Sequence, residues 1–389
     1  MRPLTDERCR VAIVGAGPQG LTVASYLVAA GVNPDDLVVI DPGGEWMVAW
    51  RRRFAQLGIA HLRSPSVHHP HPDPYALANF ARERGRQHEL VHRYGLPTTS
   101  LFDDFCAHVI SEAGLIGAVR PDAVVSVEPT GRLRLARGAG LQPDHVIWAT
   151  NPGVESGLCE SGTVVSWESA GSAGPGDRVA VVGGGLTAAH LVERALAAGA
   201  HVEWLTRRAI VEREFDTDPG WLGPKEMQAF GAVTDPGERA RRVDDARGGG
   251  TVPPWIMRRA LVAERSGRLC RRVGPVKIDP DDRSRPVLRC GGTRVDVDVV
   301  WSATGDRPCT TAAAPLDQLC DELGVSRQSG RPELDRSLRL SGSVVHVAGR
   351  LAQLQLGPTA GNLAGARRAG ELIVGAVVGA EAMYALSSF

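Results

Sequence analysis

The sequence has 389 residues, of which 43% are hydrophobic and 23% are charged, as in globular proteins of two or three domains. Because 44 basic residues balance 44 acidic ones, charge gives no reason to expect binding to nucleic acid or to an anionic membrane surface. No run of about 18 uncharged apolar residues occurs, so we expect a cytoplasmic protein without a membrane segment.

The first predicted unit is a strand, a glycine-rich turn and a helix. The run VAIV at 11–14 is short and apolar, like a strand buried on both faces, and GAGPQG follows it. In such a turn the first glycine permits the tight bend, the second lets a pyrophosphate approach the backbone, and the third lets the helix pack on the strand. The helix N-terminus directs unpaired N–H groups at the phosphates. We therefore expect dinucleotide binding by Gly15, Gly17, Pro18, Gln19 and Gly20.

The next predicted strand, residues 36–41, ends at Asp41, 21 residues after Gly20. A carboxylate at this position accepts hydrogen bonds from both ribose hydroxyls and repels a 2′-phosphate. The first unit is therefore predicted to bind FAD or NAD.

Residues 61–75, HLRSPSVHHPHPDPY, contain four of the eleven histidines. A zinc site needs three or four ligands in tetrahedral reach, and His-His-Pro-His is a poor clamp with no cysteine nearby. We predict no metal site here. Two interpretations stay open, a loop beside a bound ligand and a plain surface loop.

The second unit repeats the first one 168 residues later. RVAVVGGGLTAAHL starts at residue 178, Gly183 and Gly185 align with Gly15 and Gly17, and Ala188 replaces the third glycine. The predicted cofactor-binding residues of this turn are Gly183, Gly185, Leu186 and Thr187. The strand after this helix ends in Arg207 and Arg208 with no acid at its tip. Guanidinium groups suit a 2′-phosphate, so this unit is predicted to prefer NADPH to NADH, unless the two arginines are only a solvated charge pair.

A linker and an insertion divide the rest of the chain. ESAGSAGPGDR at 168–178 is rich in glycine and serine and is predicted to connect two domains. Residues 216–270 interrupt the second unit with predicted helices. The insertion either covers a substrate entrance or is purely structural.

Several further segments resemble those of one flavoprotein family. GGEW at 43–46 resembles the GGxW segment of flavin-dependent monooxygenases, and HVIWATNPG (145–153) and DVVWSATGDRP (298–308) resemble the crossover segments of two-dinucleotide flavoproteins, with Asn151 in place of a glycine. Residues 343–373 resemble the last FAD segment, with Gly349, Arg350 in place of the usual acid, and a long helix expected from Gly357-Pro358. Together these segments resemble class B flavin monooxygenases, nearest to the lysine/ornithine N-hydroxylase-like family.

The resemblance implies an α/β fold with two Rossmann-like domains, in which an NADPH domain is inserted into a split FAD domain. The implied parts are FAD domain 1–168, NADPH domain 172–305 with the insertion 216–270, and FAD domain 306–389. It also implies that Trp46, Arg63 and Ser64 lie near the flavin, together with Gly349 and Gly357. A homo-oligomer is compatible with it.

The implied reaction is hydroxylation of a small amine or amino acid with NADPH and dioxygen, through a C4a-hydroperoxyflavin. Sulfur or ketone substrates remain alternatives, and no catalytic residue is predicted. The alternative functions are an NADPH-linked flavin oxidoreductase without oxygen insertion and a non-catalytic flavoprotein sensor. Seven dispersed cysteines without a C-x-x-C pair argue against a dithiol version of the reductase.

Overall fold

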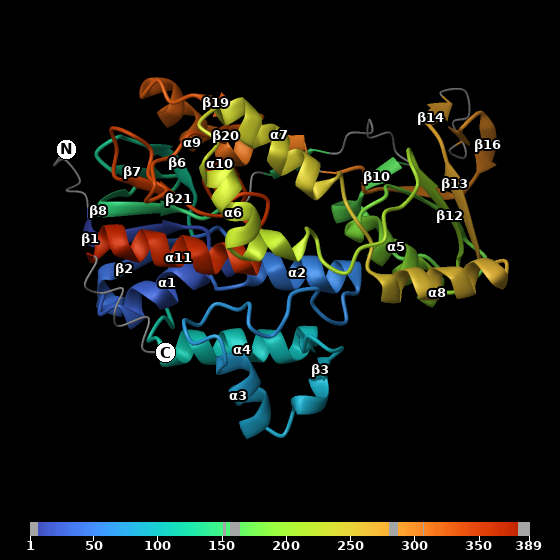
Figure 1. The fold of residues 1–389 in the computed structure, drawn as a ribbon, viewed down its shortest axis with the longest axis horizontal. Helices are drawn as coiled ribbons and strands as arrows, with labels where there is room; N and C mark the ends of the chain where they lie inside the picture. The colour runs from blue at the N-terminus through green and yellow to red at the C-terminus, as the bar shows by residue number, and fades with distance from the viewer. Residues whose placement is uncertain (1–6, 151–152, 156–163, 280–286, 306, 380–389) are drawn as a thin grey trace.

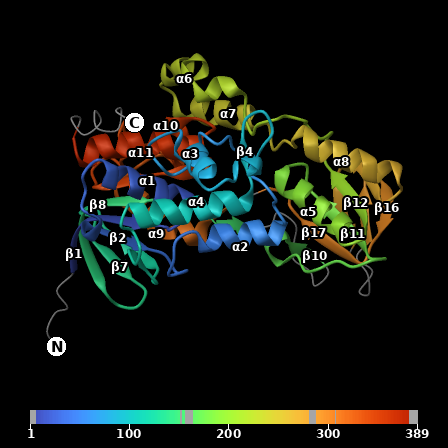
Figure 2. The same ribbon diagram turned by 90° about the horizontal axis from the view of Figure 1, so that it is seen from below.

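The structure, a computed structural model, describes residues 7–150, 153–155, 164–279, 287–305 and 307–379. Two separate sheets lie toward opposite ends of the molecule, one around β1 and one around β11–β13 (Figures 1 and 2). Within the described ranges, no helix is both long and apolar enough to cross a bilayer.

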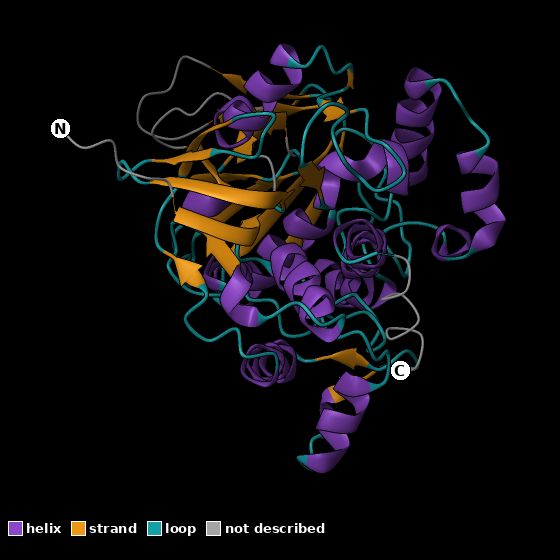
Figure 3. Cartoon of the chain, turned by 90° about the vertical axis from the view of Figure 1, so that its left-hand side faces the viewer, coloured by secondary structure: helices purple, strands orange, loops and turns teal. Residues whose placement is uncertain are grey.

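The first sheet has seven strands around the parallel pair β1 and β8. Val11, Ala12 and Ile13 of β1 are fully buried, because helices cover one face and further strands and α9 cover the other. Figure 3 shows helices packed along this sheet. The strands are β1 (Glu7–Val14), β2 (Leu37–Ile40), β5 (Val119–Arg120), β6 (Val124–Val127), β7 (Leu133–Leu135), β8 (Gly140–Trp148) and β21 (Val345–Val347). The helices are α1 (Pro18–Ala29), α2 (Val48–Leu57), α3 (Ala76–Glu83), α4 (Thr99–Glu112) and α11 (Leu363–Val377).

The last part of the chain returns to the first sheet. β21 pairs in parallel with β8, with Val345 opposite Val146 and Val347 opposite Trp148. α11 packs against α1 along the same face of the sheet. The first domain is thus built from two chain segments. One precedes the residues of the second sheet in the sequence, and the other follows them.

The second sheet is entirely parallel, in the order β10-β17-β11-β12-β13. One face packs on α5 and α8, and the other packs on a small antiparallel sheet, β14–β16. The elements are β10 (Val164–Ser166), β11 (Arg178–Val182), α5 (Leu186–Ala197), β12 (His201–Thr206), α8 (Pro254–Arg265), β13 (Leu269–Val273), β14 (Val276–Asp279), β15 (Val287–Cys290), β16 (Thr293–Asp296) and β17 (Val299–Ser302).

Two details differ from the predicted boundaries. β10 pairs with β17, so the second sheet begins before residue 168. The insertion is narrower than 216–270, because α8 packs in the core of the second domain through Ile256, Met257, Ala260 and Ala263. The helices that lie outside this core, beside the first domain, are η4 (Pro219–Leu222), α6 (Pro224–Gly231) and α7 (Pro236–Arg247).

Short elements complete the connections. The two crossings between the domains lie side by side, because β9 (Gly153–Glu155) pairs antiparallel with β18 (Arg307–Cys309). The remaining elements are η1 (Pro34–Asp36), η2 (Gln87–Glu89), β3 (Leu90–Val91), β4 (Leu96–Pro97), η3 (Trp167–Ser169), α9 (Thr310–Glu322), β19 (Arg327–Gln328), β20 (Arg331–Pro332), η5 (Gly349–Ala352) and α10 (Gln353–Leu356).

Candidate cofactor sites

The first glycine turn joins β1 to α1 in the geometry of a phosphate cradle. Gly15 has a φ of 108°, and its N–H donates to the Ile40 carbonyl at 2.8 Å, which holds the turn at the end of the sheet. A Cβ at Gly20 would lie 2.0 Å from the Gly15 oxygen, so only glycine permits this approach of helix and strand. At Gly17, the residue before Pro18 and the start of α1, a Cβ would meet no described atom within 4 Å. The N-terminus of α1 is therefore open to a phosphate.

Asp41 lies beside this turn, where the sequence places a ribose acceptor. One carboxylate oxygen accepts from the Ala16 N–H at 2.9 Å, and the other accepts from the Gly43 N–H at 2.8 Å. Each oxygen keeps a further lone pair for a ribose hydroxyl. The carboxylate thus holds the turn in shape and still offers the acceptors that an adenosine ribose requires.

Two buried polar atoms at the first turn lack a partner. The Gln19 side-chain amide N–H donates to the Asn362 carbonyl at 3.1 Å, but its Oε1 finds no hydrogen-bond partner among the described residues, and neither does Oγ1 of Thr150. Such atoms are costly to bury unsatisfied and mark places where a bound group would supply the missing bond. Both lie at the turn, Gln19 beside Gly349 and Thr150 beside Gly15. The residues present therefore fit a dinucleotide.

The final segment meets this turn from the other side. Gly349 and Gly357 have φ values of 78° and 73°, in the region that favours glycine. The Arg350 side chain packs over Gly361, where a Cβ would lie 2.6 Å from its Cγ. The long helix predicted from Gly357-Pro358 begins later, at Leu363, because the Asn362 side chain accepts from the Gly365 N–H at 3.1 Å and caps it. That part of the prediction is wrong.

The second glycine turn has the same construction. Gly183 has a φ of 146°, and a Cβ there would lie 2.2 Å from the Ala303 oxygen. The Trp204 indole N–H donates to the Gly183 carbonyl at 2.8 Å, and α5 starts at Leu186 and Thr187 directly after Gly185. Oγ1 of Thr304, on the crossover beside it, is buried without a partner in the described chain. This turn also fits a dinucleotide.

Arg207 and Arg208 lie at the C-terminal tip of β12, and both are exposed. Arg208 donates to the Gly248 carbonyl, in the loop after α7. The two guanidinium groups thus stand at the rim of the second turn, in the place that Asp41 takes at the first. The two glycine turns have the same backbone construction. They differ in the charge of the side chains beside them, which is negative at the first turn and positive at the second.

The three side chains predicted near the flavin have different surroundings. The Trp46 indole is 5% exposed, lies in the core of the first domain and donates to the Leu115 carbonyl at 3.0 Å. Arg63 instead points toward the second domain, while Ser64 is half-buried. The Trp46 ring thus packs in the core of the first domain, and its contact with a cofactor stays a prediction.

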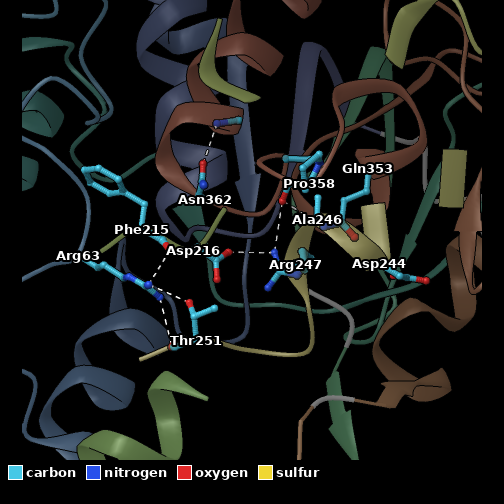
Figure 4. Close-up of polar contacts among 12 residues, drawn as sticks. Arg63, Phe215, Asp216, Asp244, Ala246, Arg247, Thr251, Gln353, Pro358 and Asn362 are labelled. Carbon is cyan, nitrogen blue, oxygen red and sulfur yellow. Dashed lines mark hydrogen bonds and ion pairs between the residues drawn. The ribbon is translucent and has the colours of Figure 1, made fainter. Parts of the chain in front are cut away.

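Arg63 joins the two domains (Figure 4). Its guanidinium donates to the carbonyls of Arg213, Glu214 and Phe215 at 2.6–2.9 Å and to the Thr251 hydroxyl at 2.8 Å. Burial lowers the pKa of Arg63 to about 10, which leaves it charged at neutral pH. Residues 150 or more positions away in sequence are its partners, and no local signal indicates them.

The insertion docks on the final segment of the first domain, which sequence reasoning also missed. A Cβ at Gly357 would lie 3.3 Å from the Met227 sulfur and 3.5 Å from the Trp221 ring. Arg239 donates to the Leu354 carbonyl at 3.1 Å, and Arg247 donates to the Pro358 carbonyl at 3.3 Å. α6 and α7 therefore cover residues 354–358 (Figure 1).

Comparisons with known proteins agree with this geometry. Residues 12–152 match a family model described as FAD-NAD(P)-binding, whereas no match is found among curated proteins. The ornithine N-hydroxylase of Kutzneria sp. 744, solved with reduced FAD, NADP⁺ and L-ornithine, has a TM-score of 0.74 and 18% identity, over 95% of this chain and 99% of that one. The chain has the fold of the two-dinucleotide-binding-domain flavoproteins.

Two further solved structures share this fold. The reduced ornithine hydroxylase from Pseudomonas aeruginosa has a TM-score of 0.72 and 16% identity, over 95% of this chain and 98% of that one. The bacillithiol disulfide reductase from Bacillus cereus has a TM-score of 0.60 and 16% identity, over 95% and 99%. The predicted α/β fold of the class B monooxygenase type is confirmed, and the family model over residues 12–152 agrees with the predicted FAD and nicotinamide nucleotide. The substrate and the individual site residues stay predictions.

The histidine-rich loop, residues 61–75, is packed as part of the first domain. His69 is fully buried, with Nε2 donating to the Pro74 carbonyl at 3.2 Å and Nδ1 accepting from the His71 N–H at 3.2 Å. Arg367 of α11 donates to the carbonyls of His71 and Pro72 at 2.5 and 2.8 Å. In the described part of the chain, no three His, Cys, Asp or Glu side chains group as metal ligands would.

This loop should make the stability of the protein depend on pH. Burial, with the charge of Arg367, lowers the pKa of His69 to about 3 and that of His68 to about 4. Because the unfolded chain takes up these protons near pH 6.5, stability is fully present above that pH and is lost as the pH falls toward 4. Each group can contribute about 1.4 kcal/mol per pH unit in this window. We expect urea midpoints to fall steeply between pH 7 and pH 5.

The matching variants are His69→Gln and His201→Gln. His69→Gln should reduce the slope of unfolding free energy against pH, whatever its stability at pH 7. His201 is exposed at the start of β12, so its replacement should leave the slope unchanged. Equal slopes in all three proteins would contradict the assignment.

Proposed function

We propose that the protein is an FAD- and NADPH-dependent monooxygenase that hydroxylates an amine nitrogen of a small molecule. The observation that carries the proposal is the pair of glycine turns with opposite charge at their rims, Asp41 at the first and Arg207 with Arg208 at the second. This pairing suits one nucleotide without a 2′-phosphate and one with it. The ornithine hydroxylases that share the fold support the amine as substrate class.

FAD, when bound, supplies the redox chemistry: it accepts a hydride from NADPH and activates dioxygen. Gly17 and the N-terminus of α1 would hold its pyrophosphate, and Asp41 its ribose. The buried Gln19 Oε1 remains available to accept a further hydrogen bond. The protein's part is binding, orientation and exclusion of water.

Water is excluded by residues that come from the other domain. Trp221 and Met227 lie against Gly357, and Arg247 holds the Pro358 carbonyl. These contacts cover the segment that follows Gly349 at the first turn. The proposed role of the insertion is therefore a cover over the substrate entrance, which is one of the two roles that the sequence left open.

The substrate amine must lose its proton before it can act as a nucleophile. An alkylammonium group has a pKa of about 10.4 in water, and burial in an apolar site lowers it by disfavouring the charged form. An enclosed site under the insertion would have this effect. We assign no catalytic base.

A second candidate function is an NADPH-linked disulfide reductase. It is favoured by the likeness to the bacillithiol disulfide reductase, with a TM-score of 0.60. The sequence has no C-x-x-C pair, and its seven cysteines are dispersed along the chain, with free thiols in both domains at Cys9, Cys106, Cys270, Cys290 and Cys320. We therefore place it second.

The deciding experiment follows NADPH oxidation by the FAD-loaded protein in air. With a panel of diamino acids and small amines, at least one compound should increase the rate about tenfold or more and yield a hydroxylamine in near-equal amount to the NADPH consumed. Oxidation that depends on an added low-molecular-weight disulfide, and proceeds equally without oxygen, would favour the reductase instead.

A further inference from the structure

The two cradles differ in what lies against their second glycine. A Cβ at Gly17 would meet no described atom within 4 Å, so the first cradle is open. At the equivalent Gly185, a Cβ would lie 3.7 Å from the Cα of Gly250. In the other direction, a Cβ at Gly250 would lie 3.0 Å from the Cα of Gly185. The backbone after α7 thus rests on the second cradle, at the position where a pyrophosphate approaches.

This covering segment consists of three glycines, Gly248–Gly250, which we call the strap. Their φ values are 59°, 75° and 101°, so the strap is held in a conformation that other residues rarely adopt. The Gly248 carbonyl accepts from Arg208, and a Cβ at Gly249 would overlap the Arg208 guanidinium. The strap therefore contacts the Arg208 side chain as well as the backbone of the second glycine turn.

Both ends of the strap are anchored to the first domain (Figure 4). On one side Arg247 donates to the Pro358 carbonyl at 3.3 Å and pairs with Asp216 at 3.1 Å. On the other side Thr251 accepts from Arg63 at 2.8 Å. The strap thus consists of three glycines, the residue type with the greatest backbone freedom, between two anchored residues.

We propose that the strap closes the second cradle in the nucleotide-free protein and is displaced when NADPH binds. The proposal rests on the proposed function, because it takes the second cradle as the NADPH site. Displacement uncovers Gly185 for the pyrophosphate and frees Arg208 for the 2′-phosphate. Because Arg247 directly precedes the strap and holds the Pro358 carbonyl, occupancy of the NADPH site affects the segment that leads to the flavin cradle.

A closed strap reduces the apparent affinity for the nucleotide by the fraction of molecules that are open. A methyl group at Gly250 meets backbone rather than a flexible side chain, so Gly250→Ala should destabilise the closed strap. We expect this variant to bind NADP⁺ about threefold to tenfold more tightly than the wild type, measured by calorimetric titration of the FAD-loaded full chain. Unchanged or weaker binding by a folded variant would overturn the proposal.

The control is Gly267→Ala, at the end of α8. Gly267 also has a positive φ, 73°, and a Cβ there meets no described atom within 4 Å. This variant carries the same kind of backbone strain without touching the cradle, so its affinity for NADP⁺ should equal that of the wild type. A gain as large as that of Gly250→Ala would assign the effect to strain in general and overturn the proposal.

Hydrogen exchange of the wild-type protein keeps the test independent of the variants. The N–H groups of Gly248 and Gly250 donate to Asp244 and Arg247 in the closed strap. Saturating NADP⁺ should speed exchange in peptides covering 244–252, although ligands ordinarily slow it. Slower exchange there would mean that the strap closes over the nucleotide, and the proposal would fail. If the wild type does not bind NADP⁺ at all, the assignment of the NADPH site fails instead.

Discussion

Replacing both Arg207 and Arg208 by alanine should raise the Michaelis constant for NADPH by about tenfold to hundredfold and that for NADH by less than about threefold. A hydrogen bond to a charged group contributes about 1.5–3 kcal/mol, and 1.4 kcal/mol is a factor of ten in affinity. The expected loss corresponds to one or two such bonds to the 2′-phosphate, since both side chains are exposed to solvent. Steady-state kinetics with both nucleotides measures the ratio.

The matched control for this pair is Arg265→Ala, which removes an exposed guanidinium from α8 of the same domain. It should leave the NADPH-to-NADH ratio unchanged, because only its long-range charge is lost and salt screens that over about 10 Å. Equal losses for NADPH and NADH in the double variant would mean that the arginines do not read the 2′-phosphate. The single variants add a further distinction. Since Arg208 donates to the Gly248 carbonyl, Arg207→Ala should have the larger effect if the strap stays closed.

The parts of the site that sequence predicts are those whose geometry is local. A glycine at position 15 or 183 is required by the turn itself, and Asp41 stands at the tip of the very next strand. Spacing along a few residues therefore places these groups correctly without knowledge of the rest of the chain. The cap at Asn362 is also local, and the Asn-x-x-Gly pattern at 362–365 could have located the start of α11 better than Pro358 did.

The parts that sequence does not predict depend on contacts between distant segments. Arg63 binds carbonyl groups at 213–215, which carry no side-chain signature at all. The motif predicts that Trp46 lies near the flavin, but it does not predict that the indole donates a hydrogen bond to the distant Leu115 carbonyl. In the sequence the strap is visible only as three consecutive glycines. Its contact with Gly185 follows from how α7 docks on the first domain. Such contacts are decided by tertiary packing, which a local sequence pattern does not describe.

Gly20→Ala should abolish stable FAD binding and give a nearly colourless protein. The added Cβ would stand 2.0 Å from the Gly15 carbonyl oxygen, and backbone cannot yield there as a flexible side chain could. The helix must then move away from the strand, which costs about 1–3 kcal/mol or more and misdirects the N–H groups that hold the pyrophosphate. The second cradle tolerates Ala188 at the same place, so the change is specific to the closer packing of the first.

Gly31→Ala supplies the comparison, since Gly31 ends α1 with a φ of 91° and a Cβ there meets no described atom within 4 Å. That variant should lose about 1 kcal/mol of stability and keep its flavin. Absorbance of the purified proteins and titration with FAD decide between them, and a Gly20→Ala protein that binds FAD as tightly as Gly31→Ala would show that the cofactor does not depend on this turn.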